Sequence, residues 1–80
     1  MIVEYFEDWK GSLSYTPVGK GVVTKFEAYL SQNSLSLEEA YENVVPFTDT
    51  LSIQKKTRSF YRTQLRRLLE YIYEEEGVKW

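Results

Sequence analysis

The sequence contains no cysteine and no histidine, and only two prolines and four glycines among its 80 residues. Without cysteine there is no disulfide and no thiolate nucleophile, and without histidine there is no imidazole base. The same two absences exclude almost every zinc or haem arrangement, so a metal would have to be held by carboxylates alone. We therefore expect no catalytic residues, no metal site and no cofactor.

The sequence also lacks an apolar run of roughly 18 residues and a basic-then-apolar leader. We accordingly expect a cytoplasmic protein without a membrane partner. The length predicts one small domain, since chains of this size bury only about 60% of their unfolded surface. With 42% hydrophobic and 16% aromatic residues, the chain can form one core.

Apolar side chains recur at helical spacing in residues 2–9, and Gly11 is placed to end a turn. The first of these residues would suit a strand equally well. Residues 1–15 are therefore interpreted as an N-terminal extension or short helix, and residues 16–80 as a helical domain.

Two helix starts are predicted in the first half of that domain. Thr16 before Pro17 is typical of a helix start, and the helix should run to about Gln32. Two glycines, Gly19 and Gly21, weaken its first turn, which leaves fraying or a loop as the alternative there. Ser36 and Glu39 have the spacing of a capping box and predict a second start.

Pro46 stops this second helix or begins another, and residues 47–51 can form a short helical turn. The longest periodic segment follows this turn, where Thr50 or Ser52 can cap it, and it ends at Gly77. Its apolar face contains Tyr61, Leu65, Leu68, Leu69 and Ile72. No segment shows the sustained alternation of a strand. The predicted fold class is all-α, a compact bundle of four or five short helices.

The charges are strongly segregated along the chain, although the net charge is only −2. Residues 55–67 carry six cations and no acid, between two acidic flanks. At 100° per residue, four of these cations form one stripe beside the apolar face of the last helix, and the other two fall on the opposite flank. The stripe is Lys55, Arg58, Arg62 and Arg66, and the other two are Lys56 and Arg67.

This charge order opposes the helix macrodipole, because the cations precede the acids along the helix. A charged helix surface can simply be solvated. Here, however, hydroxyls lie among the cations and the helix start near residues 52–57 is a natural phosphate site, which favours a helix that faces a polyanion. The hydroxyl side chains are Thr57, Ser59, Tyr61 and Thr63.

Most aromatic side chains lie on stripes that a small bundle must bury, so we expect core packing for them rather than base stacking. These residues, with one leucine, are Phe26, Tyr29, Tyr41, Phe47, Tyr61 and Leu68. Burial is less clear for Tyr73 and Trp80. The acids at 74–76 are interpreted as a solvated helix end, because consecutive carboxylates point in different directions.

Three segments occur in a characteristic order: 26–30 (FEAYL), 35–40 (LSLEEA) and 57–77. The last has a threonine, an aromatic residue four later and a leucine four after that, with basic residues between them, then an aromatic run ending in acids and glycine. In this order and spacing, residues 16–80 resemble the N-terminal core-binding domain, or SAM-like domain, of tyrosine recombinases and phage integrases.

The resemblance implies a helical domain that forms one half of a clamp around duplex DNA, beside a separate catalytic domain. It implies mainly phosphate contacts, no catalytic residue in this chain, and a catalytic domain or sister subunits as further partners rather than a small-molecule substrate. The implied DNA contacts are Lys55, Lys56, Thr57, Arg58, Arg62 and Arg66, with Lys20 and Lys25 in second rank. The alternative is a protein-interaction or regulatory module whose basic helix meets an acidic partner.

Overall fold

The computed structural model describes residues 1–14 and 17–79, and within them the chain forms four α-helices, three 3-10 turns and no strand. The elements are η1 (Val3–Tyr5), α1 (Phe6–Gly11), α2 (Lys20–Gln32), η2 (Leu37–Glu39), η3 (Tyr41–Asn43), α3 (Val44–Asp49) and α4 (Lys55–Glu76). The all-α prediction is confirmed. Across the same residues, no helix combines the length and the apolar character needed to cross a bilayer.

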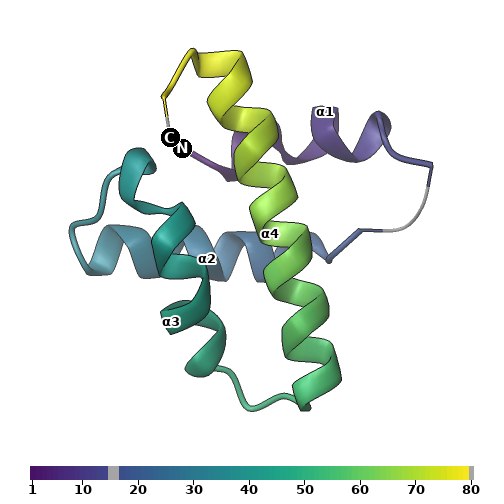
Figure 1. The fold of residues 1–80 in the computed structure, drawn as a ribbon, viewed down its shortest axis with the longest axis vertical. Helices are drawn as coiled ribbons and strands as arrows, with labels where there is room; N and C mark the ends of the chain where they lie inside the picture. The colour runs from purple at the N-terminus through teal and green to yellow at the C-terminus, as the bar shows by residue number, and fades with distance from the viewer. Residues whose placement is uncertain (15–16, 80) are drawn as a thin grey trace.

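The helices form a flat molecule of 33 × 33 × 19 Å, with α4 as its central element (Figure 1). In this view α4 passes in front of α2. The first half of α4 packs against α3, and its second half lies beside α1. Buried residues of all four helices belong to one core. In it, the ring centroids of Phe26 and Phe47 lie 5.0 Å apart.

The N-terminal segment is a short helix that belongs to this core, which confirms the helical alternative for it. Phe6 and Trp9 are buried on its inner side. The backbone N–H groups of Ile2 and Val3 donate to Oε1 of Glu27, at 2.6 and 3.1 Å. This carboxylate on α2 fixes the start of the chain against the domain.

The predicted opening turn of α2 is not helical, which agrees with the loop alternative that its glycines left open. The helix begins at Lys20, and its N-cap Gly19 is extended. Pro17 and Val18 are buried instead of opening the helix. Val18 is buried in the core, and the glycines weaken a helical turn here, so the chain is extended immediately before α2. The proposed cap Thr16 lies outside the described residues, and the predicted end at Gln32 is confirmed.

The predicted cap of α4 is also wrong, since its N-cap is Gln54, whose side chain makes no capping hydrogen bond. The hydroxyl of Thr50 donates to the carbonyl oxygen of Phe47 at 2.6 Å and so closes α3. The helix ends as predicted at Gly77, which adopts the left-handed conformation with φ of +67°.

The capping box between Ser36 and Glu39 is confirmed, with Ser36 N donating to the Glu39 carboxylate at 3.0 Å. The two hydrogen bonds from Ser36 lower the pKa of Glu39 from its ordinary value. The box opens the 3-10 turn η2 rather than a continuous helix, and the chain becomes α-helical only at Val44.

The aromatic residues largely follow the expectation of core packing. Phe26, Phe47 and Leu68 are buried, and three tyrosines expected in the core (Tyr29, Tyr41 and Tyr61) are half-buried. Tyr73, whose burial the sequence left open, is fully buried. Its hydroxyl donates to Leu37 O at 2.7 Å and accepts from Tyr41 N at 3.2 Å. These bonds satisfy the phenol inside the core, and Trp80 lies outside the described residues.

Candidate nucleic-acid interface

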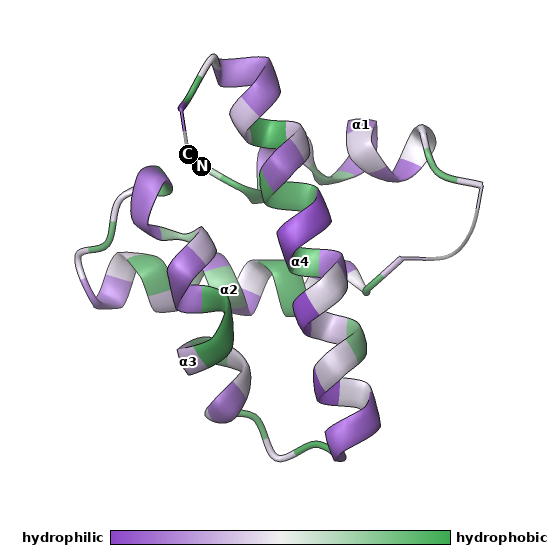
Figure 2. Cartoon of the chain, in the orientation of Figure 1, coloured by the Kyte–Doolittle hydropathy of each residue, from purple (hydrophilic) through white to green (hydrophobic). Residues whose placement is uncertain are grey.

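The six cations of residues 55–67 all lie on the first half of α4, but they face two different environments. The start of α4, at the bottom of the view, is strongly hydrophilic (Figure 2). The stripe predicted as the main DNA contact lies on the flank beside the apolar face of the helix. Three of its four members, Arg58, Arg62 and Arg66, are half-buried, and only Lys55 is exposed.

Arg62 is held by the end of α3. Its Nη2 donates to Oδ1 of Asp49 at 2.6 Å, and its Nε donates to Oγ1 of Thr48 at 2.7 Å. Thr48 is fully buried, and its hydroxyl donates to backbone carbonyls of α3. The guanidinium therefore ties α4 to α3, and its charge is already neutralised by a carboxylate.

Arg58 and Arg66 also contact the rest of the domain. Arg58 Nη2 lies 3.3 Å from the carbonyl oxygen of Ile53, in the loop before α4. The guanidinium of Arg66 lies 5.8 Å from the ring centroid of Tyr41, in the range of a cation–π contact. In both arginines Nε is buried without a hydrogen-bond partner in the described residues. Their stems pack against the domain, as expected for long side chains beside an apolar face.

A second group of side chains forms the outward face of α4, which we define as Lys56, Ser59, Phe60, Thr63 and Arg67. All five side chains are exposed, and no acid lies among them. They recur at spacings of three and four residues, so they share one side of the helix, opposite its buried residues. Lys55 adds a further exposed cation at the first turn. This face presents positive charge and hydroxyl donors together.

The remaining predicted contacts do not join this face. Thr57 is half-buried on α4, and Lys20, at the start of α2, lies 3.9 Å from the carboxylate of Glu7. Lys25 is exposed on a flank of α2, beside the half-buried Val22 and Tyr29. Lys20 and Lys25 both belong to α2 and are therefore not part of the outward face of α4.

Sequence analysis did not select Phe60 and Arg67 as site residues. Phe60 is 43% exposed, a large apolar side chain in the middle of the outward face. The signal was present in the sequence, since both residues lie opposite Leu65 in a projection at 100° per residue. The sequence alone does not show which helices pack beside α4. Without the position of α3, the arginine stripe and the outward face could not be told apart.

Comparisons with known protein families, with curated proteins and with solved structures find no match to this chain.

Proposed function

We propose that this chain is a DNA-binding domain that holds duplex DNA through the first half of α4, mainly by contacts to phosphates. The observation that carries the proposal is the outward face, where two exposed cations and two hydroxyl side chains lie together without an acid. Cations and hydroxyls are the usual donors to phosphate oxygens, and such contacts supply most sequence-independent affinity.

The start of α4 strengthens the attraction for phosphate. The first N–H groups of a helix have no partner within the helix, and the N-cap Gln54 makes no side-chain capping bond. Lys55 and Lys56 are exposed at this end, where the helix dipole is also positive. A phosphate placed here meets backbone donors and two ammonium groups, and it lowers the cost of placing cations at this helix end.

The resemblance to the core-binding domains of tyrosine recombinases and phage integrases supports the same proposal. On that reading the chain grips DNA and positions a separate catalytic domain, and it contributes no catalytic residue. We include a cytoplasmic location in the proposal. The DNA contacts we propose are Lys55 and Lys56, with Ser59, Thr63 and Arg67, while Arg58, Arg62 and Arg66 act mainly by holding α4 in place.

The experiment that tests the proposal compares two doubly charge-reversed variants in fluorescence anisotropy with a labelled duplex of about 25 base pairs at low salt. Lys55→Glu/Lys56→Glu should weaken binding at least about tenfold, because it removes two phosphate contacts and adds repulsion. Lys25→Glu/Lys79→Glu carries the same change of net charge away from the outward face. Equal losses in the two variants would show that net charge alone governs binding and would contradict the proposed surface.

The position of Phe60 favours a second candidate, a protein-interaction module with an acidic partner helix. An exposed aromatic ring among cations is typical of the anchor of such an interface. Phe60→Ser should then abolish capture of the partner, whereas phosphate binding should change little because the ring carries no donor. A chain that binds no duplex at low salt while remaining folded would favour this candidate.

A further inference from the structure

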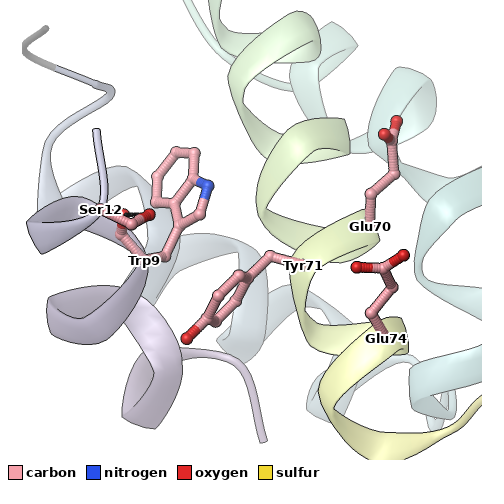
Figure 3. A pocket seen from close by; sticks show the side chains of 5 residues that line it. All are labelled: Trp9, Ser12, Glu70, Tyr71 and Glu74. Atoms are coloured by element: carbon pink, nitrogen blue, oxygen red, sulfur yellow. Dashed lines mark hydrogen bonds between the residues drawn. The ribbon is translucent and has the colours of Figure 1, made fainter. Parts of the chain in front are cut away.

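A cleft of about 360 Å³ lies between α1 and the second half of α4, further along the helix than the outward face (Figure 3). Trp9 and Ser12 line it from the α1 side, and Glu70, Tyr71 and Glu74 line it from α4. The Tyr71 ring reaches from α4 towards α1, as Figure 3 shows. Trp9 is only 3% exposed, so the indole is fixed by the core and forms a rigid wall.

The negative charge of this cleft is not compensated within the described residues. Neither Glu70 nor Glu74 forms an ion pair there, although Glu70 is half-buried. The pKa of Tyr71 is raised from its ordinary value by desolvation and then by the charges of Glu75 and Asp8. The carboxylates of Glu75 and Asp8 therefore add to the negative charge around Tyr71.

The helix end adds to this charge. Glu74 lies in the last turn of α4, where the unpaired carbonyl groups of the helix also carry negative charge. Acids at this position destabilise the free helix, so a bound cation would be attracted both by the carboxylates and by the helix end. A phosphate would be repelled by the same groups, which excludes DNA as the occupant.

We propose that this cleft binds an arginine side chain of a partner protein. A guanidinium can stack its plane on an aromatic ring and at the same time donate two parallel hydrogen bonds to a carboxylate. The cleft offers Tyr71 for the first contact and Glu74, three residues further along the same helix, for the second. An ammonium group is compact and strongly hydrated and matches this planar arrangement less well. The inference does not depend on DNA binding, because it concerns the other half of α4.

The test is an NMR titration of the ¹⁵N-labelled chain with the peptide acetyl-Gly-Arg-Gly-amide. The probe for selectivity is acetyl-Gly-citrulline-Gly-amide, which keeps the shape of arginine without its charge. We expect saturable shifts of the Trp9 indole N–H and of the backbone N–H groups of Ser12 and Tyr71 with the arginine peptide, and none with the citrulline peptide.

Two variants assign the shifts to the cleft. Glu70→Gln/Glu74→Gln should weaken binding of the arginine peptide by about fivefold or more, since loss of the carboxylate contact costs roughly 1 kcal/mol. Glu38→Gln/Glu42→Gln removes the same charge near η2 and η3 and should leave the affinity unchanged. Shifts that do not saturate, that appear equally with citrulline, or that persist in the first variant would overturn the proposal.

Discussion

Arg62 on α4 and Asp49 at the end of α3 form an ion pair of 2.6 Å, and the same guanidinium donates to the buried hydroxyl of Thr48 at 2.7 Å. A residue whose type and spacing predict a DNA contact is thus a link between two helices. The Asp49 side chain is 58% exposed, so solvent weakens the ion pair, while the bond to Thr48 is shielded.

We predict that Arg62→Gln lowers the free energy of unfolding by about 1–2 kcal/mol, mainly because the Thr48 hydroxyl loses its donor. Arg62→Lys should not restore stability, because lysine lacks the fork that reaches both oxygens. Urea denaturation measures both effects, and a double-mutant cycle with Asp49→Asn isolates the ion pair. A full rescue by lysine would show that charge alone matters at this position.

Tyr73→Phe should destabilise the domain by about 1–3 kcal/mol, because it leaves the Leu37 carbonyl and the Tyr41 N–H without their shared partner. The matched control is Tyr71→Phe on the same helix, whose hydroxyl forms no hydrogen bond within the described residues and should matter by less than about 0.5 kcal/mol. Thermal unfolding followed by circular dichroism gives both values. Equal effects would mean that the hydroxyl of Tyr73 is not held as described.

Gly77→Ala should cost about 1–2 kcal/mol, because alanine is strained at the φ of +67° that ends α4. No atom lies within 4 Å of an added Cβ, so backbone strain is the only cost. Gly11→Ala meets equally open space without a positive φ and should be neutral or stabilising. The denaturant midpoint should therefore fall for Gly77→Ala and stay unchanged or rise for Gly11→Ala.

Glu27 makes the stability depend on acid pH. Burial raises its pKa, but the N–H groups of Ile2 and Val3 and the terminal ammonium group lower it by more, so the net pKa is below its ordinary value. The carboxylate therefore contributes stability above roughly pH 4.5, and this contribution is lost as pH falls through the lowered pKa.

A variant pair checks this sign. Glu27→Gln should be less stable than the native chain at pH 7, and the difference should shrink towards pH 3, whereas Glu38→Gln should show no such trend. Urea midpoints between pH 3 and 7 measure it. A difference that stays constant with pH would contradict the role of the ionised Glu27 carboxylate.

Local signals predict much of this fold. The capping box at Ser36 and the glycine at Gly77 act within a few residues, and both are found where expected. The start of α2 depends on where Val18 packs, and the burial of Tyr73 depends on carbonyl and N–H groups more than 30 residues away. Sequence periodicity does not contain such distant contacts.

The candidate site shows the same limit. Sequence analysis locates the basic segment on α4, but it cannot tell which cations the neighbouring helix uses. Arg62 is held in place by Asp49, which lies 13 residues earlier in the sequence. The two side chains are in contact only because α3 packs beside α4. Lys56 is exposed and forms no ion pair within the described residues, so its proposed role depends on its exposure alone.

The most direct measurement of the central claim is the salt dependence of duplex affinity for the native chain and for Lys55→Gln/Lys56→Gln. With three or four phosphate contacts, the native log–log slope should be roughly −3 to −4, and the variant should be shallower by about 2, close to 0.9 for each lost contact. Equal slopes for the two proteins, or no binding by the folded native chain at low salt, would contradict the claim that the first half of α4 holds DNA.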